Sequence, residues 1–321
     1  MRYAPRNILY ATDLSEQSSL ALPHGVAIAK RYGAKLTVCH VMDVAPTAVQ
    51  EGLFAAVPVP LEAIEEARER ADAGIRSLLR GSSTSWEVRI LEGRAAVEIP
   101  RLAAEIDADL VIVPTHGRPG WKRALLGSVT DQLVHGLEAP LLTVPPAVPL
   151  KIDDFAPNKI VLGCDFSPDS MQAVSHASAI AQEYQAELHL VHVLEPSIYR
   201  MLEKNVTELV LRLEEAVRES VGHRLHELLS EEVCEWSRVV TAVLSGTAHA
   251  EILRYAKDVG ADLIVVGVRG HRNLHEFLVG STTDRILRQA PCPVLTLRKD
   301  AARAPERGAR SNLEKTTIGA T

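Results

Sequence analysis

An internal repeat constrains this 321-residue chain more than any other feature of its sequence. The segment ILYATDLS at residues 8–15 aligns with IVLGCDFS at residues 160–167, an offset of 152 residues. Later matches lie 153 residues apart and pair 93 with 246, 108–110 with 261–263, and 127–128 with 280–281. At roughly 150 residues per domain, the chain length also predicts two units. The chain is therefore expected to contain two copies of one fold.

The repeat also sets the expected domain boundaries. We expect a first domain over residues 1–147, a linker over 148–157, a second domain over 158–298 and a C-terminal tail over 299–321. The linker region is rich in proline, which disfavours the interiors of helices and of central strands. The tail has almost no apolar periodicity, which is typical of a mobile terminus.

The composition argues against nucleic acid and membrane as partners. The 35 basic and 41 acidic residues give a net charge of −6, and the chain has only 3 Trp, 6 Tyr and 4 Phe. Neither a basic surface for phosphate backbones nor an aromatic platform for bases is expected. No apolar run approaches the roughly 18 residues of a membrane span. The sequence begins without an apolar leader, so we expect a cytoplasmic protein.

Short apolar runs alternate with longer stretches of helical period in both copies. Strands are expected at 7–12, 36–42, 87–91, 109–114 and 141–144, and again at 159–164, 188–194, 237–243, 262–267 and 294–297. This pattern predicts an α/β protein with two tandem, doubly wound, five-stranded parallel-sheet domains of Rossmann-like type. Ser15 and Ser167 are candidate N-caps of the first helix of each copy, and Gly33 is a candidate C-cap. Ligands of such sheets bind beyond the carboxyl ends of the strands.

The clearest chemical motif follows the fourth strand of the second copy. It has the form G-x-x-G-x9-G-S and consists of Gly267, Gly270, Gly280 and Ser281. Glycines permit positive φ angles and close backbone approach, and the start of the following helix adds positive potential. The motif is neither a P-loop nor a dinucleotide fingerprint, so the residues alone predict an anion site that suits a phosphate chain.

At these residues the chain resembles the universal stress protein family, whose nucleotide-binding members share this glycine motif and an aspartate after the first strand. The resemblance covers about residues 5–145 and 157–298. It implies a protein that binds ATP, with or without Mg²⁺, and that works in the stress response as a sensor or adaptor. Family members commonly dimerise through the last strand of the sheet.

The resemblance also implies roles for individual residues. In the second copy it places Asp165 near the adenine and ribose, the backbone of Val193 against the adenine, Gly267 and Gly270 around the phosphates, and Gly280 and Ser281 at phosphate and ribose. In the first copy it gives the same roles to Asp13, Val41, Gly117, Gly127 and Ser128.

The first copy departs from the motif at one position. Pro114 stands where the first glycine would be. Proline has no N–H and fixes φ, so one donor and one permissive position are lost. The second copy is therefore expected to be the better ligand site.

Plainer interpretations of these residues stay open. Asp13 and Asp165 suit the electrostatics of a helix start without any ligand. The Gly-Ser pairs are equally typical of helix entry with a serine cap. His40 and His192, at the ends of apolar strands, are expected to be structural. Arg269 is expected to make a general basic contact with a phosphate, as is His116 of the first copy.

Two other functions also stay open. One is an ATP hydrolase or phosphotransferase in which Asp13 or Asp165 helps to hold Mg²⁺, and the other is a structural or partner-binding protein with empty pockets. The sequence offers no clear base for phosphoryl transfer, so we assign no catalytic residue and expect binding rather than turnover. No metal-ligand spacing occurs, and the scattered cysteines are expected to be reduced; they are Cys39, Cys164, Cys234 and Cys292.

The last strand of each copy is expected to lie at a sheet edge, and open apolar edges tend to find partners. We predict that residues 140–144 and 293–297 pair within one chain and form a pseudo-two-fold unit. Association of two such chains, and the identity of protein partners, stay open.

Overall fold

The computed structural model describes residues 3–43, 60–115, 126–146, 155–195, 208–229, 233, 235, 238–270 and 279–299. In the first half the elements are β1 (Asn7–Ala11), α1 (Glu16–Tyr32), β2 (Lys35–Met42), α3 (Leu61–Leu79), β3 (Trp86–Glu92), α4 (Ala95–Glu105), β4 (Leu110–Pro114), α5 (Ser128–Gly136) and β5 (Leu141–Val144). In the second half they are β6 (Lys159–Gly163), α6 (Pro168–Tyr184), β7 (Glu187–Leu194), α8 (Glu208–Glu227), β8 (Val239–Ser245), α10 (Ala248–Val259), β9 (Leu263–Gly267), α11 (Ser281–Gln289) and β10 (Val294–Leu297). The predicted strands are all present, and the largest difference is β8, which lies two residues later than expected.

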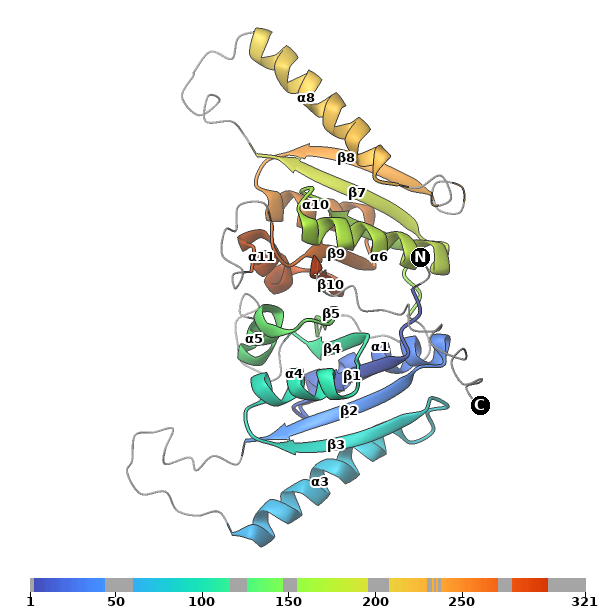
Figure 1. The fold of residues 1–321 in the computed structure, drawn as a ribbon, viewed down its shortest axis with the longest axis vertical. Coiled ribbons are helices and arrows are strands. Elements are labelled where there is room, and N and C mark those ends of the chain that lie inside the picture. Colours follow the sequence, from blue (N-terminus) through green and yellow to red (C-terminus); the bar gives the residue numbers. More distant parts are fainter. Residues whose placement is uncertain are drawn as a thin grey trace, which may run out of the picture.

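All the strands belong to one ten-stranded sheet, ordered β3-β2-β1-β4-β5-β10-β9-β6-β7-β8. Strands within each half pair in parallel. The two halves join where β5 and β10 pair antiparallel, with Leu295 opposite Leu142. The predicted pairing of the two last strands within one chain is confirmed, and Figure 1 shows the halves meeting along this line.

Helices cover both faces of the sheet, as the doubly wound prediction requires. Alternate residues of β1 enter different cores: Ile8 and Tyr10 pack in a layer with α1, α3, α6 and α8, whereas Leu9 and Ala11 pack in a layer with α4, α5, α10 and α11. This alternation follows from the two-residue period of a strand. Both cores run through the two halves, so the halves share their apolar layers.

The predicted helix caps are confirmed. Ser15 and Ser167 are the N-caps of α1 and α6, and their hydroxyl oxygens accept from the N–H of Ser18 and Ser170. Gly33 ends α1 in the left-handed conformation, with φ of 63°. Local chemistry therefore fixes where the first helix of each half begins, which is the point where the candidate site starts.

The repeated Ala-Asp-Leu triplets have a structural role. Asp109 Oδ2 accepts from the backbone N–H of Arg6 at 2.7 Å and of Asn7 at 2.9 Å. In the second half, Asp262 Oδ2 accepts from the N–H of Asn158 at 2.8 Å and of Lys159 at 3.0 Å. Each aspartate ties the beginning of the first strand to the beginning of the fourth, and so holds the centre of its half-sheet in register.

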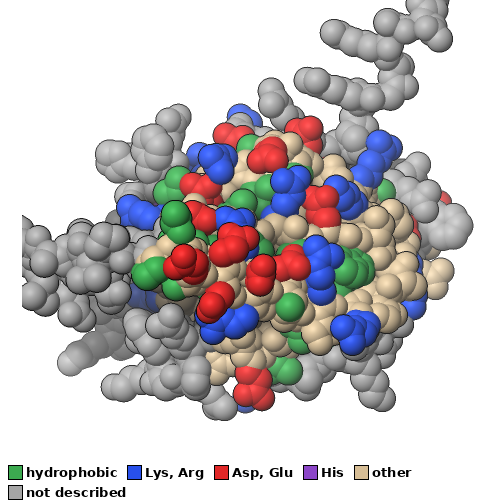
Figure 2. Space-filling model, turned by 90° about the horizontal axis from the view of Figure 1, so that it is seen from below, with side chains coloured by type: hydrophobic (Ala, Val, Ile, Leu, Met, Phe, Trp, Pro, Cys, Tyr) green, Lys and Arg blue, Asp and Glu red, His purple; other side chains and the backbone are tan. Residues whose placement is uncertain are grey.

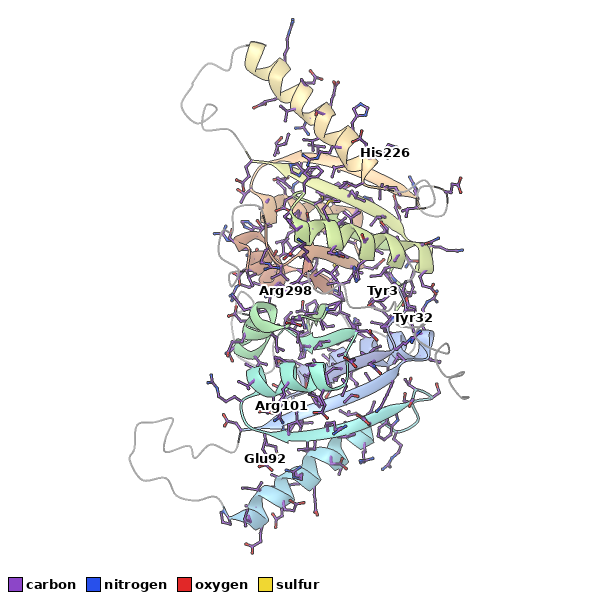
Figure 3. All side chains as sticks on the ribbon, in the orientation of Figure 1. Tyr3, Tyr32, Glu92, Arg101, His226 and Arg298 are labelled. Carbon is purple, nitrogen blue, oxygen red and sulfur yellow. The ribbon has the colours of Figure 1, made fainter. Side chains whose placement is uncertain are left out.

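Aromatic side chains exchanged between the halves reinforce the strand pairing. Tyr3, from the first half, packs edge-on against His176 of α6 with ring centroids 6.4 Å apart. Phe155, from the second half, packs against His24 of α1 at 5.8 Å. These contacts are equivalent under the 152-residue repeat, so the interface has the predicted pseudo-two-fold character. Figure 3 shows Tyr3 beside the boundary between the halves.

Arginine side chains close the same boundary on the other face of the sheet. Arg298, just after β10, donates to the carbonyl oxygens of Val134 and His135 in α5. Figure 3 labels Arg298 where the halves meet. Arg288 of α11 donates to Asp131 of α5 at 3.2 Å. The helices that begin at the two candidate sites are therefore joined directly.

The outer end of the first half is a solvated, mixed-charge surface. Glu65, Glu66, Glu69 and Arg70 of α3 are exposed, as the dense Glu/Arg pattern predicts. Figure 2 looks at this end and shows acidic and basic side chains interspersed over it.

The remaining expectations concern the termini, the linker and the cysteines. Residue 147, residues 148–154 of the predicted linker and residues 300–321 of the tail lie outside the described residues, as does Cys234. Cys39, Cys164 and Cys292 are buried, and none of them is in a disulfide. None of the helices in the described part of the chain is both long and apolar enough to cross a bilayer.

Candidate functional site

A cavity lies at the carboxyl ends of the strands in each half. The first cavity has a volume of about 580 Å³ and is lined by residues of β1, β2, β4 and the starts of α4 and α5. The second has a volume of about 410 Å³ and is lined by the equivalent elements of the other half. Both volumes lie in the range of small-molecule sites, about 300–1,000 Å³. We refer to them below as the first cavity and the second cavity.

The structure brings the predicted site residues of each copy together. Asp13, Val41, Gly127 and Ser128 line the first cavity, and Gly117 lies outside the described residues. The six predicted residues of the second copy all line the second cavity: Asp165, Val193, Gly267, Gly270, Gly280 and Ser281. The described members of both sets therefore lie at equivalent positions of the two cavities.

The two aspartates are held by the turn that follows the first strand. Asp13 Oδ1 accepts from the N–H of Ser15 at 3.0 Å, and Asp165 Oδ1 accepts from Ser167 at 3.0 Å. The residue between each pair is in the left-handed region, which is strained for a side chain other than glycine. The aspartates therefore both support the helix start and line the cavity.

Histidines at the ends of β2 and β7 hold the backbone through their Nδ1 atoms, and His192 also lines the second cavity. His40 Nδ1 donates to the carbonyl oxygen of Thr12 at 2.9 Å, and His192 Nδ1 donates to that of Cys164 at 2.8 Å. Each bond ties the second strand to the end of the first strand. This geometry supports the structural interpretation of both histidines.

Of the two properties that glycine permits, positive φ and close approach, Gly267 and Gly270 do not use the first, since neither lies in the left-handed region. Close approach is what these positions require. A β-carbon on Gly267 would lie 2.7 Å from the backbone nitrogen of Ser170 in α6. A β-carbon on Gly270 would lie 2.6 Å from Asp165 Oδ2. Gly267 thus lets α6 pack on β9, and Gly270 leaves room for the aspartate.

Helix entry at the Gly-Ser pairs also differs from the serine-cap interpretation. Gly127 and Gly280 are the N-caps, and Ser128 and Ser281 are the first residues of α5 and α11. Neither N-cap makes a side-chain hydrogen bond to its helix, because glycine has no side chain to cap with. The helix N-termini that line the cavities are therefore left open to an anion.

Arg269 does not act as a free phosphate contact. Its Nε lies 3.0 Å from Asp169 Oδ2 and its Nη2 lies 3.3 Å from Oδ1. Asp169 is 3% exposed and also accepts from the N–H of Arg269 and of Lys299. The side chain of Arg269 is bound to a buried carboxylate, which corrects the expected role. His116, the equivalent residue of the first copy, lies outside the described residues.

Pro114 occupies the position in the first copy that Gly267 occupies in the second, and the local architecture is the same in both. Pro114 ends β4, and its carbonyl oxygen accepts from Thr130 Oγ1 at 2.9 Å. The carbonyl oxygen of Gly267 accepts from Thr283 Oγ1 at 2.7 Å. Each threonine anchors the first turn of its helix to the end of the fourth strand, so the proline does not displace α5.

Sequence reasoning missed the contribution of the turn after the third strand. Gly93, Arg94 and Ile99 line the first cavity, and Ile252 lines the second. The signal was present in the repeat, which pairs Gly93 with Gly246. Both glycines have strongly positive φ angles, 127° and 146°. This turn aims the start of α4, and of α10, at the cavity.

The cavities also contain cysteine and acidic side chains. Burial raises the pKa of the Cys39 thiol to about 12, so this residue is a neutral apolar contact at physiological pH. Burial also raises the pKa of Cys164 in the second cavity. Asp43 lines the first cavity and Glu195 the second. No group of three or more metal-ligating side chains occurs in the described ranges.

Comparison with known proteins identifies the same two halves. The sequence model of the universal stress protein family matches residues 5–145 and 157–298. A universal stress protein of Mycolicibacterium smegmatis is 27% identical over 304 residues, which cover 91% of this chain and 96% of the relative. A universal stress protein of Methanocaldococcus jannaschii is 34% identical over 143 residues, 44% of this chain and 82% of the relative.

The fold is also that of a solved structure. The crystal structure of a universal stress protein from Archaeoglobus fulgidus covers 91% of this chain and 98% of its own, with a TM-score of 0.65 and 21% identity. At this identity the likeness shows a shared architecture, and it extends over both halves.

Proposed function

This chain belongs to the universal stress protein family, and from that premise we propose that each of its two cavities binds one molecule of ATP. We further propose that the protein acts as a sensor or adaptor in the stress response, with occupancy of the cavities as its signal. The resemblance of the glycine motif to that of nucleotide-binding family members supports the choice of ligand.

One observation carries the proposal. In both halves an uncapped helix N-terminus lines the cavity, at Gly127-Ser128 and at Gly280-Ser281. The N-cap N–H is already used, since Gly127 donates to Thr115 and Gly280 to Val268. The N–H groups of the first turn are the ones that an anion can take, and the helix dipole adds to their attraction.

The remainder of each cavity suits a base and a sugar. Val41 and Ile99 give the first cavity an apolar side, and Val193 and Ile252 do so in the second. An apolar side next to a polar helix start matches a ligand with a flat base at one end and phosphates at the other.

Equilibrium dialysis with labelled ATP tests the proposal. Ser128→Glu and Ser281→Glu each place a carboxylate at the first position of an exposed helix start, where it favours the helix dipole but repels phosphate. We expect two ATP per wild-type chain, one for each single variant and none for the double variant, with no loss of thermal stability. Ser128→Ala and Ser281→Ala are the matched controls and should keep both sites. Equal binding by the wild type and the Glu double variant contradicts the proposal.

The same samples decide between binding and turnover. Nucleotide recovered uncleaved favours a binding protein, whereas steady phosphate release that disappears in Asp165→Ala would support a hydrolase or phosphotransferase. Dialysis with Mg²⁺ and with EDTA tells whether the ion accompanies the phosphates. A wild type that binds no nucleotide would support the purely structural or partner-binding alternative.

A further inference from the structure

The charged side chains that line the two cavities differ in how they are engaged. The first cavity is lined by Asp13, Asp43 and Arg94. The second is lined by Asp165, Glu195 and Arg269. Each set contains two carboxylates and one guanidinium, so a count of charges would make the cavities equivalent.

The guanidinium of the second cavity is already paired. Arg269 makes two hydrogen bonds to the carboxylate of Asp169, whose side chain is 4% exposed. Turning Arg269 toward a ligand would leave a buried carboxylate without its counter-charge, which is strongly unfavourable. Arg269 therefore stays with Asp169, and the second cavity offers a ligand no unpaired cation among its described lining residues.

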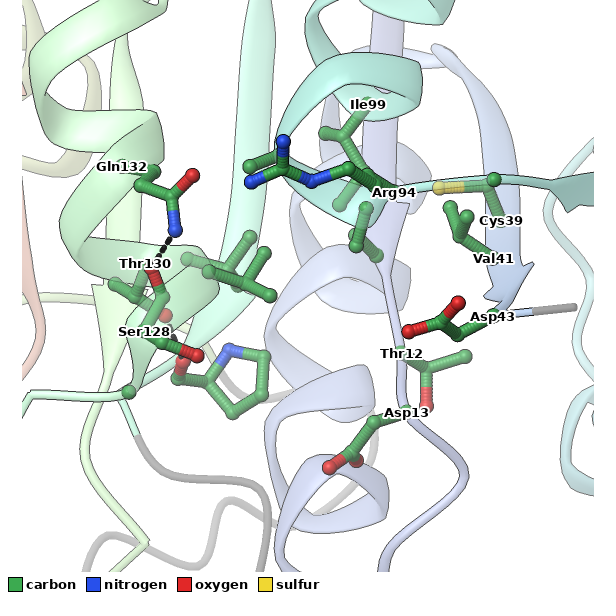
Figure 4. A pocket seen from close by; sticks show the side chains of 18 of the residues that line it. Thr12, Asp13, Cys39, Val41, Asp43, Arg94, Ile99, Ser128, Thr130 and Gln132 are labelled. Carbon is green, nitrogen blue, oxygen red and sulfur yellow. Dashed lines mark hydrogen bonds between the residues drawn. The ribbon is translucent and has the colours of Figure 1, made fainter. Parts of the chain in front are cut away.

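The guanidinium of the first cavity is not paired. Arg94 precedes α4 and is exposed, and its guanidinium makes no hydrogen bond or ion pair within the part of the chain that the structure describes. Figure 4 shows its side chain extending from the start of α4 across the cavity toward the α5 side, where Ser128 and Gln132 lie. The repeat places Thr247, a neutral residue, at the equivalent position of the second half.

We propose that Arg94 contacts the phosphate chain of a nucleotide in the first cavity and makes that cavity selective for polyphosphates. The second cavity, by contrast, binds adenine nucleotides with an affinity that depends little on the number of phosphates. The proposal rests on the proposed function and adds how strongly each cavity discriminates between ligands of different charge. A guanidinium forms charge-assisted, frequently bidentate hydrogen bonds to phosphate oxygens, and threonine cannot replace it.

The test uses full-length chains in which one cavity is closed. In the Ser281→Glu background, which leaves the first cavity, calorimetry measures the affinity for ATP, AMP and adenosine, with and without Arg94→Thr. We expect Arg94→Thr to lower the affinity for ATP by about tenfold or more and to reduce the effect of salt on ATP binding. The affinity for adenosine should change by less than about twofold. Arg101→Thr is the matched control, because it removes a charge from α4 at a position outside the cavity lining. Arg101→Thr should bind all three ligands as its parent does.

The reciprocal substitution tests the second cavity. In the Ser128→Glu background we expect ATP and AMP to bind with similar affinity, and Thr247→Arg to raise the affinity for ATP several-fold over that for AMP. The proposal is overturned if Arg94→Thr leaves the affinity for ATP unchanged, or lowers the affinities for ATP and adenosine equally. Either result leaves the proposed function intact. A wild type that binds none of the three ligands overturns both.

Discussion

Gly270 and Asp165 lie so close that a β-carbon on residue 270 would sit 2.6 Å from the aspartate Oδ2. Real β-carbons essentially never come within 3.0 Å of such an atom, so any side chain at 270 has to displace the carboxylate. The contact joins the aspartate that follows the first strand to the loop that follows the fourth strand. Two features that the sequence presents separately are thus one structural unit.

Gly270→Ala is therefore expected to damage the second cavity specifically. The added β-carbon moves the Asp165 carboxylate, and we expect ATP affinity in the Ser128→Glu background to fall by about tenfold, the effect of one lost charge-assisted hydrogen bond. Calorimetry measures the affinity, and thermal unfolding should change little. Gly222→Ala is the control, because a β-carbon there meets nothing within 4 Å. An unchanged affinity in Gly270→Ala would argue that Asp165 does not contact the nucleotide.

Asp262→Ala is expected to weaken the second half without touching its cavity. The substitution leaves the N–H groups of Asn158 and Lys159 without their carboxylate partner. Because this site is solvent-exposed, we expect a loss of only about 1 kcal/mol in the free energy of unfolding, measured by urea denaturation. The exposed Asp258 of α10 provides the control, Asp258→Ala. A loss no larger than that of the control would show that the aspartate does not hold the strand starts.

Arg269→Met is expected to lower the free energy of unfolding more than Asp262→Ala does, because it leaves the buried Asp169 carboxylate without its positively charged partner. Removing one partner of a buried ion pair typically costs about 3–5 kcal/mol, and we expect about 3 kcal/mol here, since the arginine is partly exposed. The double variant Asp169→Asn, Arg269→Met should recover part of that loss in the same denaturation assay. If the double variant is less stable than the single variant, the carboxylate is not the source of the cost.

Acid is expected to destabilise the boundary between the halves through His24. Burial against Phe155 lowers the pKa of His24 from 6.5 to about 4. Between about pH 6.5 and pH 4, His24 therefore binds a proton in the unfolded chain but not in the folded chain. The free energy of unfolding is at its full value above pH 6.5 and falls as the pH decreases through this window. The loss is on the order of 3 kcal/mol. Burial lowers the pKa of His176 too, which acts in the same direction.

Urea unfolding midpoints measured from pH 7 to pH 4 test this dependence. His24→Leu should flatten the decrease, because the variant has no group to protonate at this position. His226→Gln, at an exposed position of α8, is the control and should follow the wild type. A His24→Leu variant with the same acid sensitivity as the wild type would place the sensitivity elsewhere.

The predictable part of the site is its backbone frame. The N-cap serines, the glycine motif and the aspartates follow local rules of turns and helix starts, and the repeat shows them in both copies except for the first motif glycine, which is Pro114 in the first copy. Arg94 and Ile99 could not be found in this way, because their place in the lining of the first cavity depends on how α4 packs against the sheet. The same holds for Arg269, whose partner Asp169 lies on α6 and competes with any ligand for its guanidinium.

The fold as two copies of a doubly wound α/β domain, and the position of residues such as Asp165 and Gly270 at the carboxyl ends of the strands, follow from the amino-acid sequence. These conclusions depend on short-range periodicity and on the order of strands and helices, which is the same in both copies of the repeat. Three further properties are visible only in the folded chain: Gly270 makes room for Asp165, the Gly-Ser helix starts have no side-chain cap, and the guanidinium of Arg269 is paired whereas that of Arg94 is not. Contacts between residues far apart in the chain set these properties, because hydrogen bonds and charge pairing depend on distances that spacing in the sequence does not contain.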